Sequence, residues 1–204
     1  MLPRTIQTRQ SVPRALRVLP WLVIAAILGA TVIAMRLEGR IWWCEEGDWS
    51  IWISNVWTSH CSQHWFDPYS ITHMAHGLIF FCAMVLLAHL APRWSVPQRW
   101  RLCVAIGIAA AWEVLENSPI IINRYRTATM SLDYLGDSIA NAVGDIVACA
   151  IGFAIARRIG WKWSLGLLLA TEIVLLFLIR DNLTLNVIML IRPIEAVKQW
   201  QAGG

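Results

Sequence analysis

The sequence predicts an all-α integral membrane protein, a bundle of about five transmembrane helices with a cytoplasmic N-terminus. Three observations lead to this fold class. The 204-residue chain is 57% hydrophobic and only 15% charged, and its mean hydropathy is +0.54, outside the usual range of soluble domains. Apolar runs of about 20 residues recur along the chain. Many of the 13 Trp residues stand at the ends of these runs, where the indole ring prefers the headgroup region.

Five apolar runs are long enough to cross a hydrocarbon core of roughly 30 Å as helices. A sixth run, Leu185 to Ile191, is too short to span. The first run follows basic residues, as a signal peptide does, but Met35-Arg36-Leu37-Glu38 offers no small-x-small cleavage site, so we expect a retained anchor. The predicted spans are Leu19 to Met35, Ile71 to Ala91, Leu102 to Ile122, Leu135 to Ala156 and Trp163 to Ile179.

The basic residues set the predicted orientation, because cytoplasmic segments carry an excess of Lys and Arg. The chain divides into a basic cytoplasmic N-terminus (1–18), one transmembrane domain (19–180) with a Trp-rich periplasmic segment (37–70), and a periplasmic or interfacial C-terminal tail (181–204). An N-terminus inside places 10 of the 17 basic residues on the cytoplasmic side. These are Arg4, Arg9, Arg14, Arg17, Arg93, Arg99, Arg101, Arg157, Arg158 and Lys162.

The net charge of +4 does not point to a nucleic-acid partner, because the basic residues are scattered over short inter-helix segments and form no continuous stripe. We expect them to lie beside anionic lipid. Membrane lipid is therefore the predicted partner, in a multi-pass protein of the cell inner membrane.

The Trp-rich segment contains two Cys and two His residues. Cys44 and Cys61 would lie on the oxidising side of the membrane. The sequence leaves two alternatives, a disulfide between them or two unpaired thiols. For His60 and His64 we expect exposed surface positions, the commoner case for histidine in such a segment.

Ionisable residues within the predicted spans come in sets. Burying each costs about 2.5–3.5 kcal/mol on insertion scales, so they require a reason to be there. The sets are spaced by three or four residues, which places their members on one face of a helix. At about 1.5 Å per residue, the acidic pair of the third span lies about 9–13 Å below its outer end, close to the level that Asp145 reaches in the fourth span, so we expect the whole cluster in the outer half of the bilayer. The cluster comprises His73 and His76 of the second span, Glu113 and Glu116 of the third, and Asp137, Asn141 and Asp145 of the fourth.

The fourth span also carries small residues at strict four-residue intervals beside its polar stripe. Such a pattern allows a neighbouring helix to approach closely. We expect tight packing along the row Gly136, Ala140, Gly144, Ala148 and Gly152.

Imidazole nitrogens with carboxylate oxygens are the usual donors to Zn, Fe or Mn, and helix bundles build such sites from facing helices. The sequence thus suggests a divalent metal centre that hydrolyses or transfers a group of a lipid or lipid-linked substrate from the periplasmic side. Arg124 and Arg126, just past the third span, would hold an anionic headgroup. The predicted metal ligands are His73, His76, Glu116, Asp137 and Asn141. The predicted catalytic carboxylates are Glu113, Glu116 and Asp145.

Two other functions remain open, so the sequence does not decide whether the protein is an enzyme. The cluster could belong to a proton or cation transporter or channel subunit, or it could be a hydrogen-bond network of a non-catalytic assembly or structural protein. A transport pathway needs polar residues that continue inward, and the inner halves of the spans offer almost none apart from Thr171 and Glu172. For Glu172, alone in its span, a packing partner on another helix is the expected role.

Several multi-residue blocks resemble an uncharacterised bacterial family of multi-pass inner-membrane proteins. The similarity covers roughly residues 20 to 180, and it implies an inner-membrane location but no activity. A more distant likeness to small VanZ-like membrane proteins rests on scattered polar positions only. The blocks are Gly39-Arg-Ile-Trp-Trp-Cys, Ser62-Gln-His-Trp-Phe-Asp-Pro-Tyr-Ser with His73 and His76-Gly, Trp112-Glu-Val-Leu-Glu-Asn-Ser-Pro, Arg124-Tyr-Arg and Gly136-Asp-Ser-Ile-Ala-Asn.

Overall fold

The computed structural model describes residues 14–129 and 133–203, and within these ranges the fold is helical. The described part contains no strand, only one isolated bridge between Trp52 and Phe66. Most of the predicted N-terminal segment, including Arg4 and Arg9, lies outside the described residues. The helices are α1 (Arg14–Leu37), α2 (Pro68–Leu90), α3 (Arg101–Glu116), α4 (Pro119–Ala128), α5 (Ile139–Ile159), α6 (Trp161–Ile179), α7 (Leu183–Ile191) and α8 (Glu195–Gln201), with short 3₁₀ turns at Cys61–Gln63, Pro92–Trp94 and Gln98–Trp100.

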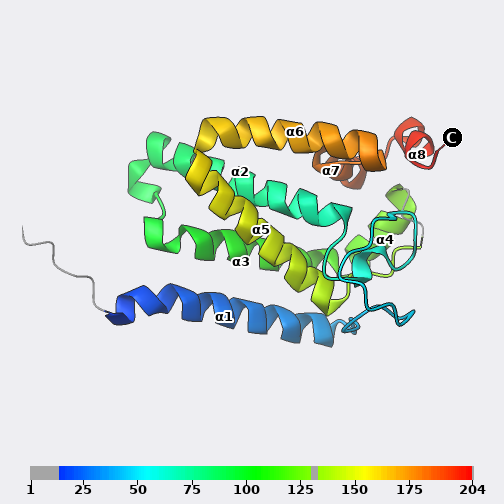
Figure 1. Ribbon diagram of the computed structural model, residues 1–204, viewed down its shortest axis with the longest axis horizontal. Coiled ribbons are helices and arrows are strands. Elements are labelled where there is room, and N and C mark those ends of the chain that lie inside the picture. The colour runs from blue at the N-terminus through cyan, green and yellow to red at the C-terminus, as the bar shows by residue number, and fades with distance from the viewer. Residues whose placement is uncertain (1–13, 130–132, 204) are drawn as a thin grey trace, which may run out of the picture.

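Four helices, α1, α2, α5 and α6, are long and apolar enough to cross a membrane. A fifth crossing results if the bent pair α3 and α4 counts as one span, so the predicted number of about five agrees with the structure. The short apolar run near the C-terminus lies on α7, a helix of nine residues. Figure 1 shows the long helices side by side, with α4, α7, α8 and the Trp-rich segment gathered at one end of the bundle.

The third predicted span is not one continuous helix. It breaks after Glu116, and α4 leaves α3 at an angle of 72°. Pro119 lacks an N–H and cannot continue α3, while the side chain of Ser118 accepts a hydrogen bond from Ile121 N and begins α4. The unbroken helix to Ile122, from which the depth of about 9–13 Å was calculated, was therefore wrong, because Glu116 is the last residue of α3. The depth of the acidic pair in the membrane stays a prediction.

The fourth span begins four residues later than predicted, at Ile139 and not at Leu135. Gly136 has a φ of +91°, which no right-handed helix allows, and the side chain of Ser138 caps the helix by accepting from Asn141 N. Asp137 therefore precedes α5 and does not lie on a helical stripe, in contrast to the predicted arrangement.

Helix α5 is the centre of the bundle and contacts α1, α2, α3 and α6. Its tightest crossing is with α2, where a Cβ on Gly152 would collide with the Met74 carbonyl and a Cβ on Gly77 would collide with the Cys149 carbonyl. The predicted close approach is thus correct for Gly152. Gly144 instead faces the backbone of Trp65 in the Trp-rich segment, and Gly136 lies outside the helix.

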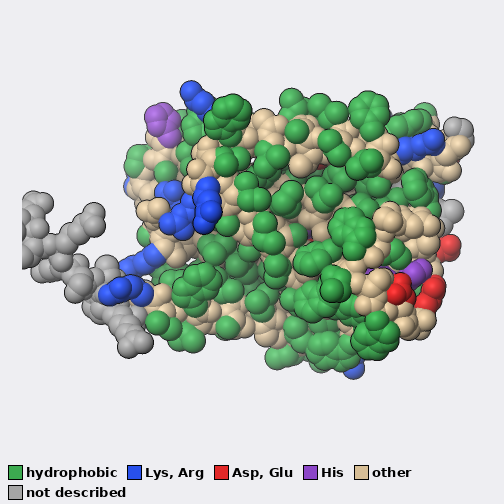
Figure 2. Space-filling view, in the orientation of Figure 1, with side chains coloured by type: hydrophobic (Ala, Val, Ile, Leu, Met, Phe, Trp, Pro, Cys, Tyr) green, Lys and Arg blue, Asp and Glu red, His purple; other side chains and the backbone are tan. Residues whose placement is uncertain are grey.

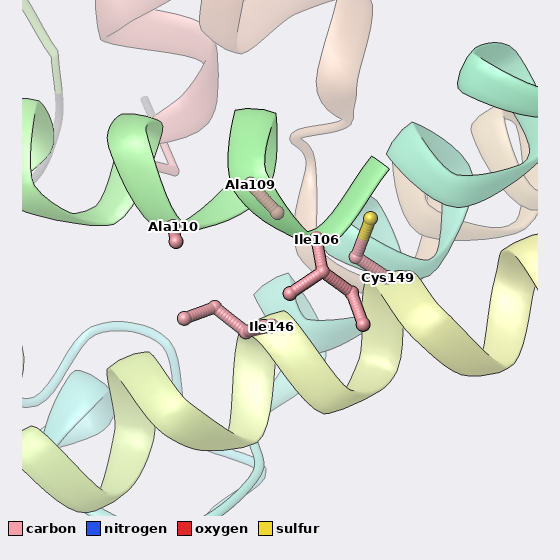
Figure 3. Close-up of a cluster of buried hydrophobic side chains, with 5 residues drawn as sticks. All are labelled: Ile106, Ala109, Ala110, Ile146 and Cys149. Carbon is pink, nitrogen blue, oxygen red and sulfur yellow. The ribbon is translucent and has the colours of Figure 1, made fainter. Parts of the chain in front are cut away.

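The apolar core between α3 and α5 is built from small and branched side chains. Figure 3 shows Ile106, Ala109 and Ala110 of α3 facing Ile146 and Cys149 of α5. A second cluster, Met84, Ala105 and Phe153, continues this core toward the end of the bundle where α3 begins. The charged side chains of α3 lie outside this core, with Arg101 at the start of the helix and Glu113 and Glu116 in its last turn.

The Trp-rich segment folds back over the N-terminus of α5. The backbone N–H groups of Ser138, Ile139 and Ala140 donate to the carbonyls of Ser62, Ile41 and Trp42. These bonds satisfy donors that the first turn of a helix leaves unpaired. The segment is therefore docked on the bundle.

Charged side chains are unevenly distributed over the molecule. In Figure 2, apolar side chains cover most of the visible face, many of the visible Lys and Arg side chains gather at the end where α1 begins, and the visible Asp and Glu side chains lie at the other end, where some Lys and Arg are also present. This distribution agrees with the charge bias behind the predicted orientation. The orientation itself stays a prediction.

Candidate functional site

The centre of the polar cluster is His73, which lies between two carboxylates. Its Nδ1 is 3.1 Å from Glu113 Oε1, and its Nε2 is 3.8 Å from Asp145 Oδ2. The three residues come from α2, α3 and α5, and all are buried. A neutral imidazole carries one proton, so it cannot donate to both carboxylates. A second proton or a metal ion is therefore needed for His73 to interact favourably with both Glu113 and Asp145.

A second group of acidic side chains shares Glu113 with the first. One oxygen each of Glu113, Glu116 and Asp137 lies within 4.8 Å of the others. Glu116 Oε1 accepts a hydrogen bond of 2.6 Å from the Tyr125 hydroxyl of α4. The two groups together hold four carboxylates and one imidazole, so their side chains would carry a net negative charge if all were ionised. Such a concentration of negative charge favours a bound cation.

Asp137 is fixed by side chains from the helix break and from the loop before α5. Asn117 Nδ2 donates to its Oδ2 at 2.6 Å, and the Tyr134 hydroxyl donates to its Oδ1 at 2.8 Å. Burial raises the pKa of Asp137 above its usual value, while the hydrogen bonds from Asn117 and Tyr134 lower it in part. Both oxygens are thus occupied, and Asp137 has less free coordinating capacity than the two glutamates.

The two glutamates retain oxygens that no described residue satisfies. Glu113 Oε2 and Glu116 Oε2 are buried and have no hydrogen-bond partner in the described part of the chain. Glu113 Oε1 meets His73 closely but outside hydrogen-bond geometry. Unsatisfied buried carboxylate oxygens are costly, so they mark the atoms available to a cation.

A cavity of about 370 Å³ adjoins the cluster. The described residues that line it include no Lys or Arg. Its polar wall includes His73, His76, Glu116, Tyr125, Tyr134, Asp137, Asp145, Asp181 and Asn186. Its apolar wall includes Phe80, Ile108, Trp112, Leu183 and Val187. Ile108 and Val187 are 47% and 44% exposed, so the apolar wall reaches the surface of the bundle. The cavity therefore suits a cation together with a partly apolar molecule.

Two predicted metal ligands have other contacts. The ring of His76 packs edge-on against His73 at 5.2 Å and stacks on Phe80 at 6.0 Å, and it belongs to neither acidic group. Asn141 Nδ2 donates to the carbonyl of His64 at 2.8 Å and lies 3.3 Å from Asp67 Oδ2. Asn141 thus ties α5 to the Trp-rich segment.

Arg124 and Arg126 bind backbone carbonyls. Arg124 donates from Nε to Leu190 O at 2.7 Å and from Nη2 to Ile191 O at 3.1 Å, which joins α4 to the end of α7. Arg126 Nε donates to Tyr134 O at 2.6 Å. Neither arginine lines the cavity. Their contact with a headgroup stays a prediction. In the structure, Arg124 ties α4 to the end of α7, and Arg126 ties α4 to the loop before α5.

Glu172 has the packing role expected of it. Its carboxylate accepts from Leu183 N at 3.1 Å and from Thr184 N at 2.9 Å, and so caps the N-terminus of α7. It is directed away from the cluster toward the α6–α7 connection.

The histidines and cysteines of the Trp-rich segment differ from expectation. His64 is fully buried and His60 is partly buried, so the predicted exposed positions were wrong. Cys44 and Cys61 are both free thiols, and no disulfide joins them. The reason is their different surroundings: Cys44 lies beside His60, whereas Cys61 packs among apolar side chains that include Leu175 and Ile179 of α6.

Sequence reasoning missed four residues of the site. Asp67, fully buried, caps α2 by accepting from Tyr69 N and Ser70 N, and burial and the nearby Asp145 raise its pKa well above the usual value. The signal was its position directly before Pro68, a frequent start of a helix. The others are Asn117, Tyr125 and Tyr134, which reach the cluster only because α3 breaks and α4 returns across it.

Comparison with known proteins gives a family without a known activity. Residues 35–203 match the family described as "Protein of unknown function (DUF2585)". The chain belongs to this family. A UPF0314 protein of Sphingopyxis alaskensis is 44% identical over 187 residues, 90% of this chain and 95% of the relative. A UPF0314 protein of Paracoccus denitrificans is 41% identical over 201 residues, 98% of each chain. No solved structure matches the chain. The resemblance to an uncharacterised bacterial family is therefore confirmed, and the family match extends beyond residue 180 to residue 203.

Proposed function

We propose that this protein is a metal-dependent hydrolase or transferase that acts on a lipid or lipid-linked substrate, at the periplasmic side of the cell inner membrane. The observation that carries the proposal is His73 between Glu113 and Asp145, next to a cavity that holds carboxylates but no described Lys or Arg. A divalent cation there offsets the negative charge and binds the unsatisfied carboxylate oxygens. Imidazole and carboxylate donors fit Zn, Fe or Mn.

The residues divide by their access to the cavity. Glu113 is fully buried and absent from the cavity wall, a position that suits a metal ligand. It belongs both to the group with His73 and Asp145 and to the group with Glu116 and Asp137. Asp145 and His73 supply further donors. Glu116 lines the cavity with one free oxygen, held in place by Tyr125 on the other. This position suits a general base.

The chemistry that follows is displacement at an ester or phosphoester. A divalent ion held by Glu113, Asp145 and His73 would lower the pKa of a nearby water. Glu116 would accept a proton from that water as the water oxygen forms a bond to the carbonyl carbon or phosphorus. The bond to the leaving oxygen breaks, and Glu116 returns the proton to that oxygen. In a transferase an acceptor hydroxyl replaces the water.

The apolar wall supports a lipid substrate. Ile108, Trp112 and Val187 extend from the cavity to the surface of the bundle, where acyl or isoprenyl chains would lie. A substrate could thus enter sideways from the bilayer while its polar part reaches Glu116. The same apolar packing counts against a transport pathway, because the Ile106, Ala109, Ile146 core closes the bundle on the inward side of the cluster.

Binding of Mn²⁺ to the detergent-purified full chain, measured by electron paramagnetic resonance, tests the metal centre. We expect wild type and Glu116→Gln to bind the ion, and Glu113→Gln to bind it at least about tenfold more weakly. The bound protein is then incubated with phospholipid and isoprenoid phosphate substrates, and products are followed by mass spectrometry. Turnover by wild type and not by Glu116→Gln supports the proposal. Equal Mn²⁺ binding by Glu113→Gln, or no product with any lipid, contradicts it. The exposed Glu195→Gln is the matched control.

A further inference from the structure

Three metal-binding side chains meet in the Trp-rich segment, apart from the polar cluster of the bundle. Cys44 Sγ lies 3.5 Å from His60 Nδ1, and His60 Nδ1 lies 3.4 Å from His64 Nε2. The three donor atoms are all within 4.8 Å of one another. Cys44 is 7% exposed and His64 is fully buried. Residues from both ends of one long loop are thus brought to a common point.

The protonation of the two rings leaves bare nitrogens facing each other. His64 Nδ1 lies 2.7 Å from the backbone carbonyl of Ser50, which can only accept, so Nδ1 carries the proton and Nε2 has a lone pair. His60 Nε2 lies 3.4 Å from Glu46 Oε2, and this carboxylate favours the tautomer with the proton on Nε2 and a lone pair on Nδ1. Two lone pairs at 3.4 Å repel each other unless a cation lies between them.

The arrangement is that of metal-ligating histidines. A ligating imidazole usually donates its other N–H to a carbonyl or a carboxylate, which fixes the ring and the tautomer. Here His64 has the carbonyl of Ser50 and His60 has the carboxylate of Glu46. A direct hydrogen bond between the rings would require one of two proton arrangements. Either both nitrogens of His64 carry a proton, or His60 carries its proton on Nδ1 and presents an unprotonated Nε2 to the Glu46 carboxylate.

The separations of the donor atoms fit a tetrahedral ion. With Zn–N of about 2.0–2.1 Å and Zn–S of about 2.3 Å, tetrahedral angles put two nitrogens about 3.3–3.4 Å apart and a nitrogen and a sulfur about 3.5–3.6 Å apart. The corresponding distances in this protein are 3.4 Å and 3.5 Å. A fourth donor is close, since Asp48 Oδ2 lies 3.8 Å from His64 Nε2.

We propose that Cys44, His60 and His64 form a zinc site, with the Asp48 carboxylate or a water as the fourth ligand. A thiolate with two imidazoles is a donor set that zinc prefers, and four-coordinate sites of this kind stabilise small irregular segments. The ion links residues near both ends of the loop, and the adjoining carbonyls of Trp42 and His64 accept bonds from α5. The site therefore holds the Trp-rich segment against the bundle, where Ser59 and Ser62 line the cavity. It does not depend on the proposed enzymatic function.

Cobalt substitution tests the site, because thiolate coordination has its own optical signature. The full chain, purified in detergent and stripped with a chelator, is titrated with Co²⁺. We expect a thiolate-to-cobalt charge-transfer absorption and the intense visible bands of a tetrahedral ion, displaced by about one equivalent of Zn²⁺. Cys44→Ser and His60→Gln should lose these bands. Cys61→Ser, a buried thiol of the same segment outside the site, should retain them.

The outcomes separate this site from the cluster in the bundle. Glu113→Gln should leave the thiolate absorption unchanged, because the acidic groups contain no sulfur. Chelation should lower the thermal stability of wild type but not that of Cys44→Ser. The thermal unfolding transition of Cys44→Ser also shows that this variant folds. The proposal is overturned if wild type gives no thiolate absorption, if Cys44→Ser keeps it, if the chain binds copper alone, or if Cys44 and Cys61 prove to be joined in a disulfide.

Discussion

Asn117 and Asp137 are joined by two hydrogen bonds that run in opposite directions. The Asn117 side chain donates from Nδ2 to Asp137 Oδ2 at 2.6 Å and accepts through Oδ1 from Asp137 N at 2.7 Å. Asn117 lies at the break between α3 and α4, and Asp137 lies just before α5. This pair thus fixes the angle of the broken helix relative to the central helix.

Replacement of Asn117 by Ala should destabilise the fold. Three buried side-chain hydrogen bonds are lost, two with Asp137 and one to the Glu113 carbonyl. We expect a decrease of about 1.5–3 kcal/mol in the free energy of unfolding. Denaturant unfolding in detergent measures it. Asn123→Ala, an exposed asparagine on α4, should change stability by less than about 0.5 kcal/mol. Equal effects of the two variants would mean that the Asn117–Asp137 pair does not support the break.

The two histidines of α2 should differ in their effect on metal binding. His73 contacts the carboxylates of Glu113 and Asp145. The ring of His76 packs against the rings of His73 and Phe80 and belongs to neither acidic group. We expect His73→Gln to weaken Mn²⁺ binding by at least about tenfold and His76→Gln to change it much less. The same resonance titration compares them. A greater loss with His76→Gln would restore the ligand role that the sequence predicted for this residue.

A methyl group added at Gly152, where α2 and α5 cross, should destabilise the protein. A Cβ at Gly152 collides with the backbone of Met74, so the helices must separate. We expect Gly152→Ala to lower the free energy of unfolding by about 1–3 kcal/mol or more. Gly166 on α6 has open space, and Gly166→Ala should be neutral or stabilising by up to about 1 kcal/mol. Unfolding of both variants in detergent decides this, and equal stability of the two would exclude a backbone contact at Gly152.

Stability should increase as the pH falls from 7 to 5, in part because of Asp181. Burial raises the pKa of Asp181 to about 6 from an ordinary 3.8, although hydrogen bonds from Asn182 N and the Tyr69 hydroxyl oppose this. The folded state thus binds the proton more tightly than the unfolded chain. Its contribution is fully present below pH 3.8 and is lost as the pH rises through about 6. The difference corresponds to at most about 3 kcal/mol.

Asp181→Asn should flatten this pH dependence. Unfolding at pH 5 and pH 7.5 measures the slope, which we expect to be smaller in the variant than in wild type. Asp67 and Asp137 also have raised pKa values, so part of the slope should persist. Glu195→Gln removes an exposed carboxylate and should leave the slope unchanged. An unchanged slope in Asp181→Asn would show that this carboxyl is not held in its protonated form.

The membrane helices were predictable from the sequence because long apolar runs leave few alternatives, and four long apolar helices and one bent pair agree with the five predicted runs. The break at Asn117-Ser118-Pro119 was not predicted, although proline after a capping serine is a local signal. The predicted span passed over this signal because Ile120, Ile121 and Ile122 continue the apolar run beyond the break.

The centre of the site was predictable to the extent that helical spacing determined it. His73, Glu113, Glu116 and Asp145 came together as expected. The roles of Asn141, Arg124 and Arg126 were not predictable, because each binds a backbone carbonyl whose position depends on a loop. The burial of His64 was missed for the same reason. Loop contacts lack the periodicity that makes helix faces readable from sequence.

The apolar core of α3 also bears on the membrane potential. Eleven residues, Leu102 to Trp112, separate Arg101 from Glu113, a rise of only about 18 Å. With water in the cavity above this core, most of the voltage across the bilayer falls over the core and little of it over the cavity. A cation that enters from the cavity therefore crosses only a small part of the electric field. Its occupancy should follow the ion composition of the fluid on that side, at any membrane voltage.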